Sequence, residues 1–383
     1  MKPSRKVELF FALALVLMAV LTTAANVSAR PDPGASREDA LVELNGRVKE
    51  LPRVQTFLGL WLGLGLTAAA GVNLALLRKL RRGEKVADAI AEPPPWSVLD
   101  FTLVFVLTIA ATQVAVPREH LELADGRTFA LGKKPVAVGD ATFEVAKGAV
   151  VVSGSVVVND RRVEGTTKLA RGDRLVVDGV AGVLLPTTAR YLGMLSLASL
   201  VGPLLALGLV RARGGTLADL GLTGFSIREV ARGLVGYLAL VPGVVLLMIV
   251  SALLCRALGT PFESHPLLEG LETDRNPLTL ALLLVLTVVI APFGEEILFR
   301  GLLLRSMRTA FGSLALGILA SSFFFGALHP GLASLLPIGW VGAVCAALYA
   351  TSPRRSIFAS MICHGLFNGV NVALEYVILK SLG

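Results

Sequence analysis

The chain of 383 residues is too apolar for a soluble protein: 54% of its residues are hydrophobic, only 17% are charged, and its mean hydropathy is +0.72. Its formal net charge is +8, but much of the basic excess borders apolar runs, where it orients membrane spans and does not indicate a nucleic-acid partner. The three cysteines lack C-x-x-C spacing and indicate neither a disulfide framework nor a thiolate metal site.

Residues 1–29 have the pattern of a secretory signal peptide or of an uncleaved signal-anchor. Three basic residues precede an apolar run from Leu9 to Leu21, and the small-residue segment 27–29 follows. The two alternatives stay open at this point. Both of them place Arg30 and the residues after it outside the cytoplasm.

Residues 30–116 are predicted to form an N-terminal region with two transmembrane helices, at about 56–77 and 98–116. The basic cluster 78–82 marks a cytoplasmic end of the first helix. The three consecutive prolines at 93–95 separate the two helices, because proline does not continue a helix.

Residues 117–187 differ from the rest of the chain. Short valine-rich runs alternate with glycine-rich turns, which is typical of a small all-β domain. If the N-terminus is cytoplasmic and the chain crosses at each span, this domain lies outside the cytoplasm. We expect it to be either a spacer or a module that presents substrate to the membrane part.

Residues 188–383 contain the remaining predicted transmembrane helices. Each apolar run of about 20 residues matches the ~30 Å hydrocarbon thickness at ~1.5 Å per residue. Crossing at each span also leaves every short basic cluster on the cytoplasmic side. We therefore predict an all-α polytopic membrane protein with 8–9 transmembrane helices and an inserted small all-β extramembrane domain. The late spans run at about 191–210, 233–255, 277–304, 313–328, 333–350 and 357–379.

Three polar constellations interrupt the last apolar runs. A charged or imidazole side chain inside a membrane span is energetically costly, so such residues are candidates for function. Each constellation has helical spacing, which suggests one buried site assembled from three helices. They are Glu295-Glu296-x-x-x-Arg300, Phe325-x-x-x-His329 and His364-x-x-x-Asn368.

The first constellation divides into two predicted roles. Glu296 and Arg300 are four residues apart, so they share a helix face and are expected to form a supporting ion pair. Glu295 points about 100° away from Glu296. The two glutamates are therefore not expected to face the same groove. Without a local cation, Glu295 is the better candidate for a general base.

The depth of each candidate in the membrane gives a geometric check. Glu295 lies ~15 Å from the basic residue at the end of its span, and His364 lies ~14 Å from the basic residue before its span. These two residues therefore share a level. His329 is about 25 Å from the start of its span. It joins them only if its helix is tilted or begins later than predicted.

In this order on successive late spans, the three motifs resemble those of the CAAX-protease and bacteriocin-processing (CPBP) family of intramembrane glutamic-type endopeptidases. The resemblance covers about residues 190–380 and does not include the N-terminal half. It assigns residues 188–383 to a CPBP-like intramembrane protease domain. A sorting-protease (myxosortase-like) branch of this family would act on the C-terminal membrane anchor of a secreted protein.

The resemblance implies hydrolysis of a peptide bond in a membrane-associated protein or peptide. Glu295 and His329 would activate a water molecule. His364 and Asn368 would donate hydrogen bonds to the oxyanion of the tetrahedral intermediate. A base beside water and donors at the developing charge are what amide hydrolysis requires.

A metal-dependent reaction is the alternative. Glu295, His329 and His364 form a set of one carboxylate and two imidazoles that suits catalytic zinc with a water as fourth ligand. The chain has no H-E-x-x-H helix. We therefore expect a reaction without metal or other cofactor and keep zinc as the alternative.

Two other functions compete with proteolysis. A non-catalytic binding or immunity protein of the same family would have no reason to retain all four catalytic candidates. An ion transporter often shows an internal repeat, and the sequence shows none. We expect a multi-pass protein of the cytoplasmic (inner) membrane. Its expected partners are the lipid bilayer and a membrane-associated protein or peptide substrate, not nucleic acid.

Overall fold

The computed structural model describes residues 5–28, 52–82, 88–115, 120–123, 128–130, 135–146, 149–169, 173–185, 189–260, 277–329 and 331–381. The chain divides into two compact units. The first, mainly helical unit comprises residues 1–109, 199–265 and 287–383. The second unit comprises residues 110–198 and 266–286 and contains the sheet.

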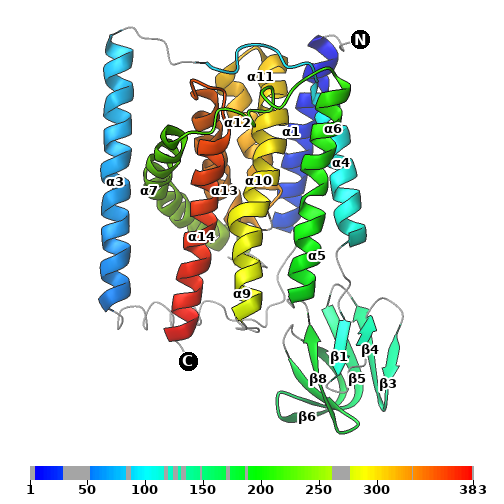
Figure 1. The fold of residues 1–383 in the computed structure, drawn as a ribbon. Coiled ribbons are helices and arrows are strands. Elements are labelled where there is room, and N and C mark those ends of the chain that lie inside the picture. Colours follow the sequence, from blue (N-terminus) through cyan, green and yellow to red (C-terminus); the bar gives the residue numbers. More distant parts are fainter. Residues whose placement is uncertain are drawn as a thin grey trace. The chain divides into compact units, whose positions relative to one another are not determined.

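Helices form at the apolar runs that the sequence predicts (Figure 1). The predicted span 191–210 is divided at Leu200 into two helices, and the predicted span 233–255 begins earlier, after the N-cap Ser226. The helices outside the run 277–311 are α1 (Arg5–Ser28), α3 (Pro52–Arg81), α4 (Val98–Ala115), α5 (Ala189–Ser199), α6 (Val201–Ala212), α7 (Ile227–Leu258), α12 (Leu314–Ala327), α13 (Leu332–Ala350) and α14 (Phe358–Ser381).

The run that carries the two glutamates is not a uniform α-helix. The short α10, which ends with the glutamate pair, lies between two π-helical segments. A π-helix is rare and is often found at functional sites. The consecutive elements are α9 (Pro277–Leu284), η1 (Val285–Ile290), α10 (Ala291–Glu296), η2 (Ile297–Leu304) and α11 (Arg305–Phe311).

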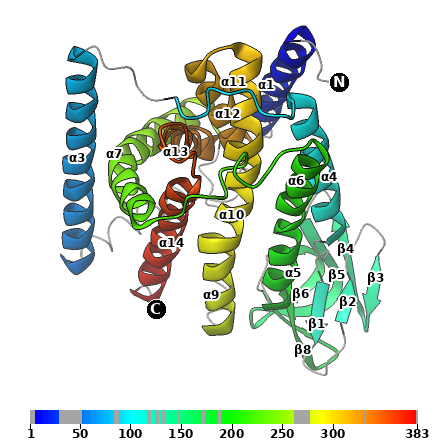
Figure 2. The same ribbon diagram turned by 45° about the horizontal axis from the view of Figure 1, so that its top comes forward.

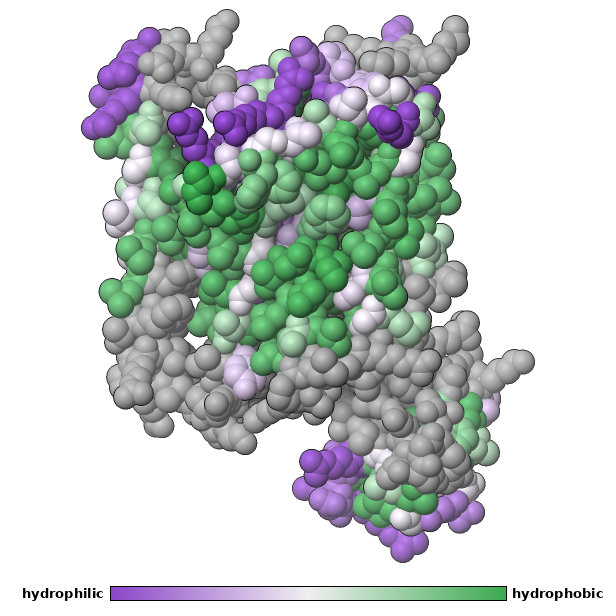
Figure 3. All heavy atoms as spheres, in the orientation of Figure 1, coloured by the Kyte–Doolittle hydropathy of each residue, from purple (hydrophilic) through white to green (hydrophobic). Residues whose placement is uncertain are grey.

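The helical unit has the surface of a membrane protein. Large apolar side chains such as Leu204, Leu253 and Leu319 are exposed, and hydrophobic residues cover much of the visible helical face (Figure 3). Four helices within the described ranges are long and apolar enough to cross a membrane: Leu192–Ala212, Ile227–Leu258, Leu280–Phe311 and Leu332–Ala350. The chain is thus a mostly helical membrane protein, while the number of 8–9 crossings stays a prediction.

The core of the helical unit is built on aromatic side chains. The ring of Phe101 lies 6.2 Å from that of Phe299 and 6.1 Å from that of Phe324, measured between centroids. Ala12 and Leu15 of α1 belong to the same buried cluster. Edge-to-face ring packing joins α4, η2 and α12, and the aliphatic side chains of α1 pack into the same cluster.

The sheet of the second unit consists of antiparallel strands, as expected from the valine-rich runs. Their order is β2-β1-β8-β7-β5-β4-β3, and β6 pairs with β5. Leu121, Phe143 and Leu175 are fully buried in its core. The domain boundaries 117–187 stay a prediction. The strands are β1 (His120–Leu123), β2 (Thr128–Ala130), β3 (Val136–Val138), β4 (Ala141–Ala146), β5 (Ala149–Val158), β6 (Arg161–Leu169), β7 (Arg174–Val177) and β8 (Val180–Leu185).

Candidate functional site

Glu296 is the centre of a buried charge network. Its side chain is fully buried, and its Oε1 atom lies 3.1 Å from Arg300 Nη1 and 2.9 Å from His364 Nδ1. The contact with Arg300 is the ion pair that the i, i+4 spacing predicts. The contact with His364 is an addition that comes from the packing of α14 against α10.

Arg300 connects this network to two further helices. Its Nη2 atom donates a hydrogen bond to the carbonyl oxygen of Gly342 in α13, at 3.1 Å. Its guanidinium carbon lies 4.7 Å from the centre of the Phe325 ring in α12. A buried guanidinium needs such partners, because an uncompensated charge in an apolar interior is strongly destabilising.

Glu295 lies near the other nitrogen of the same imidazole ring. Its Oε2 atom lies 3.7 Å from His364 Nε2 and has no hydrogen-bond partner within the described part of the chain. The expectation that the two glutamates face different grooves is therefore wrong. Nδ1 and Nε2 of one imidazole point in different directions, so a single ring from α14 meets both diverging carboxylates.

Phe325 links the second motif to the other two. Its ring centre lies 5.0 Å from that of His329 and 5.7 Å from that of His364. His329 follows the end of α12, and its Nδ1 atom lies 2.9 Å from the carbonyl oxygen of Phe325. His329 is thus connected to His364 through the ring of Phe325, while its depth relative to Glu295 stays a prediction. The sequence motif names Phe325 together with His329, but no role in the site was predicted for its ring.

Asn368 holds α14 against the first π-helical segment. Its Nδ2 atom donates a hydrogen bond to the carbonyl oxygen of Thr287 at 2.8 Å. Gly365 makes this approach feasible, because a Cβ atom there would lie 2.5 Å from the carbonyl oxygen of Val288. Thr287 was not predicted as part of the site, since a threonine within an apolar run gives no distinctive signal.

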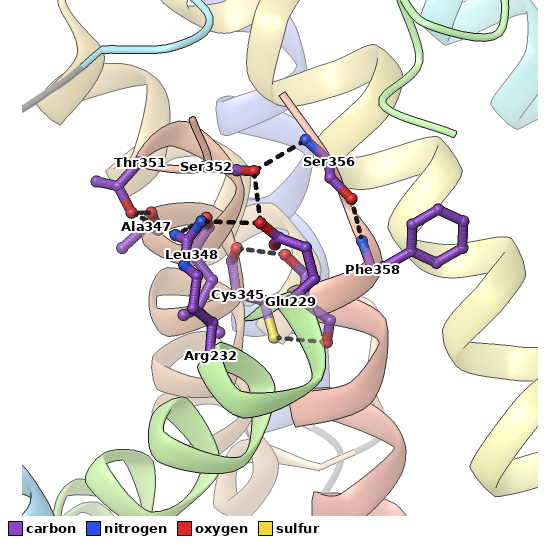
Figure 4. A network of polar contacts seen from close by, with 10 residues as sticks. Glu229, Arg232, Cys345, Ala347, Leu348, Thr351, Ser352, Ser356 and Phe358 are labelled. Atoms are coloured by element: carbon purple, nitrogen blue, oxygen red, sulfur yellow. Dashed lines mark hydrogen bonds and ion pairs between the residues drawn. The ribbon is translucent and has the colours of Figure 1, made fainter. Parts of the chain in front are cut away.

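The start of α14 is fixed by a buried polar network (Figure 4). The Ser356 hydroxyl oxygen accepts a hydrogen bond at 3.3 Å from the backbone N–H of Phe358, the first residue of α14, which has no partner within the helix. The Ser352 hydroxyl oxygen accepts from the Ser356 N–H at 3.1 Å, while the hydroxyl donates to Glu229 Oε1 at 3.2 Å. This network fixes the beginning of the helix that presents His364.

Arg232 extends the network to the end of α13. Its Nη2 atom donates to the carbonyl oxygen of Leu348 at 2.8 Å and to the hydroxyl of Thr351 at 3.0 Å. Its Nη1 atom pairs with Glu229 Oε1 at 3.3 Å. Because Glu229 and Arg232 both belong to α7, this helix is joined directly to the end of α13 and, through Ser352, to Ser356 before α14 (Figure 4).

The zinc alternative, with Glu295, His329 and His364 as ligands, stays a prediction. No group of three His, Cys, Asp or Glu side chains within the described ranges is arranged to hold a metal ion. His364 directs Nδ1 to Glu296 and Nε2 towards Glu295. We therefore derive no step that passes through a metal.

Together, the fold and the site define a class: a helical membrane protein with a buried carboxylate–imidazole site. Residues 277–370 match the family model described as type II CAAX prenyl endopeptidase Rce1-like. This confirms the family that the three motifs indicate, and the matched segment contains all of them, from Glu295 to Asn368. The chain is thus a membrane protein with a domain of a protease family. No curated protein and no solved structure matched the chain.

Proposed function

We propose that this protein is an intramembrane endopeptidase that hydrolyses a peptide bond in a membrane-associated protein or peptide. The observation that carries this proposal is the position of His364 between the carboxylates of Glu295 and Glu296, inside the Rce1-like segment. Buried charged groups at membrane depth are costly. A site of this kind is therefore expected to serve a chemical purpose.

In this proposal Glu295 is the general base. Its side chain is 33% exposed, and its Oε2 atom is buried without a hydrogen-bond partner among the described residues. A water molecule that enters the site with the substrate would supply the hydrogen that this oxygen accepts. Together with His329, Glu295 would remove a proton as the water oxygen attacks the peptide carbonyl carbon. The same proton would then pass to the amide nitrogen as the carbon–nitrogen bond breaks.

His364 and Asn368 are proposed to stabilise the oxyanion that forms during this attack. If Nδ1–H of His364 donates to Glu296, the Nε2 atom is the ring position that is directed to the reacting group. Nε2 donates a hydrogen bond to the oxyanion when both ring nitrogens carry hydrogen. Asn368 uses one N–H of its amide for Thr287, and its second N–H is the proposed oxyanion donor.

Glu296 and Arg300 are proposed as supporting residues. Their ion pair, and the bond from Arg300 to Gly342, hold the imidazole of His364 in a fixed orientation. The reaction is proposed to need no metal or other cofactor. Preorganised charges of this kind are effective because they do not rearrange during the reaction.

The proposed location is the cytoplasmic (inner) membrane, with the β domain outside the cytoplasm. We propose that α1 remains attached as a signal-anchor, because Ala12 and Leu15 pack in the core of the helical unit. The substrate class includes the C-terminal membrane anchor of a secreted protein, as in the sorting-protease branch. A leader peptide and a membrane-bound regulator belong to the same class.

The proposal is tested by comparing the membrane and secreted proteomes of cells that carry the native chain or Glu295→Gln, with peptide termini labelled. We expect specific termini to disappear in the variant and longer precursors to accumulate. The exposed surface residue Glu164 gives a matched control, because Glu164→Gln makes the same chemical change outside the site. Identical termini in all strains, with the protein well expressed, would favour the non-catalytic binding or immunity protein.

A further inference from the structure

Residues 88–97 form a segment that we call the strap. It lies between α3 and α4, outside the matched family segment, and runs across the helix ends (Figure 2). Its three prolines favour an extended backbone. Ile90 and Trp96 of the strap are almost completely buried. The strap is therefore packed into the helical unit rather than lying loosely on it.

The first set of strap contacts holds the helix run of the two glutamates. Arg308 of α11 donates from Nε and Nη2 to Asp88 Oδ2, at 2.8 and 2.7 Å. It also donates from Nη1 to the carbonyl oxygen of Ala91, at 2.8 Å. Arg305 donates from Nη2 to the carbonyl oxygen of Glu92, at 3.2 Å. Charge-assisted bonds of this kind are about twice as strong as neutral ones.

Trp96 adds a contact between the strap and the second π-helical segment. Its indole Nε1 donates a hydrogen bond to the carbonyl oxygen of Leu302 in η2 at 3.3 Å, and its ring lies 5.2 Å from the guanidinium carbon of Arg305. A buried indole N–H without an acceptor would be costly. Trp96 thus favours the conformation of η2 that offers this carbonyl group.

The second set of strap contacts holds the end of α13 and the connection that leads to the helix of His364. The backbone N–H of Ala89 donates to the carbonyl oxygen of Ala350 at the end of α13, at 2.8 Å. Glu92 Oε2 lies 2.6 Å from Arg355 Nη1 in the connection before α14. The hydrogen bond from Arg355, together with its positive charge, holds the pKa of Glu92 below its usual value.

Glu92 therefore joins the two sides of the site. Its carbonyl oxygen binds Arg305, which follows Glu296 by nine residues. Its carboxylate binds Arg355, which precedes His364 by nine residues. A relative shift of the two helix runs would break contacts on one side or the other. The strap thus resists changes in the distance between the glutamates and His364.

We propose that the strap is a positioning element that sets the spacing between the glutamate pair and His364. This inference rests on the proposed endopeptidase function. None of the strap residues touches the reacting atoms in this account. The strap residues would act by aligning the residues that touch the reacting atoms. A misplacement of ~1 Å at a catalytic site lowers a rate by up to ~100-fold.

The test compares Trp96→Phe with Trp340→Phe in the full chain, reconstituted in proteoliposomes. Trp340 also donates its indole N–H to a backbone carbonyl, that of Leu240, at 3.1 Å, but it joins α13 to α7 and not to the strap. We expect Trp96→Phe to lower kcat by roughly tenfold or more, with KM within about twofold of the native value. We expect Trp340→Phe to leave kcat nearly unchanged. Equal kcat values for the two variants would overturn the proposal.

A second readout does not depend on activity. Amide hydrogen exchange is measured for peptides from residues 297–311 and 356–368, and for a reference peptide from residues 240–258. We expect Trp96→Phe to raise exchange in the first two peptides and not in the reference. If the native protein cleaves nothing, the endopeptidase function fails, and this exchange pattern still decides the role of the strap. Unchanged exchange in both site peptides would contradict that role.

Charge reversal gives a further check. Asp88→Arg alone is expected to lower kcat, because it places two cations together where Asp88 and Arg308 now lie 2.7 Å apart. Combining it with Arg308→Asp restores opposite charges, and we expect it to recover part of the lost kcat. A double variant no more active than the single one, with unchanged exchange in the site peptides, would speak against a positioning role of this pair.

Discussion

His364 Nδ1 lies 2.9 Å from Glu296 Oε1, and this contact joins the last helix to the run that carries both glutamates. The imidazole is thereby oriented so that its second nitrogen is directed towards Glu295, at 3.7 Å. One ring thus connects the fully buried side chain of Glu296 with that of Glu295, which is 33% exposed although its Oε2 atom is buried. The difference in exposure suits different roles, support for Glu296 and contact with water for Glu295.

Glu296→Gln is expected to destabilise the protein strongly. The change leaves the guanidinium of Arg300, 2% exposed, without its counter-charge. Removing one partner of a buried ion pair costs about 3–5 kcal/mol. Thermal unfolding of the purified protein measures this, with Glu164→Gln as the surface control. A variant with the same unfolding temperature as the native protein would show that the buried pair contributes little to stability.

Asn368→Ala tests the proposed oxyanion site. Loss of the hydrogen bond to Thr287 alone would cost about 1 kcal/mol of stability. Loss of an oxyanion donor would also lower kcat by about 10²–10³-fold with little effect on KM. Steady-state kinetics and thermal unfolding, measured on the same preparation, separate the two effects. A variant that is less stable but retains its native kcat would leave Asn368 with a structural role only.

Gly365→Ala tests the close approach of α14 to the first π-helical segment. The added methyl group would lie 2.5 Å from the carbonyl oxygen of Val288, so the backbone must move. Such overpacking typically costs about 1–3 kcal/mol. Gly369→Ala is the matched control, because its methyl group would meet only the Val288 side chain, at 3.1 Å. Equal unfolding temperatures of the two variants would argue against a close backbone contact.

Chelators are expected to leave activity unchanged. No metal enters the proposed chemistry, in which Glu295 activates water and His364 and Asn368 hold the oxyanion. Cleavage is measured after incubation with a zinc chelator and again after zinc is returned. Strong inhibition that zinc reverses would instead support the alternative in which Glu295, His329 and His364 are metal ligands.

Much of the helical fold could be predicted from the sequence, because an apolar run bordered by basic residues is a strong local signal. The Glu296–Arg300 pair was also predictable from a local signal, since the two residues are four positions apart in one continuous helical run. The two π-helical segments could not be predicted, because hydrophobic periodicity does not distinguish them from an α-helix.

Contacts between distant parts of the chain were beyond sequence reasoning. The position of Glu295 beside His364 depends on how α14 packs against α10, which no spacing within one helix reveals. The same holds for Trp96 and Leu302, which are 206 positions apart in the sequence. Counting residues along its helix put His329 level with Glu295 and His364 only if that helix is tilted or begins later. His329 reaches the site through the ring of Phe325, at the end of α12.

The central claim is that Glu295 is the base of an intramembrane endopeptidase. The most direct test uses purified native protein and Glu295→Gln in proteoliposomes, with a synthetic peptide that spans the cleavage site found from the labelled termini. We predict that the native protein cleaves the peptide at that bond, while the variant, folded to the same extent, does not. Cleavage at the native rate by Glu295→Gln, or no cleavage by either protein, would contradict the claim.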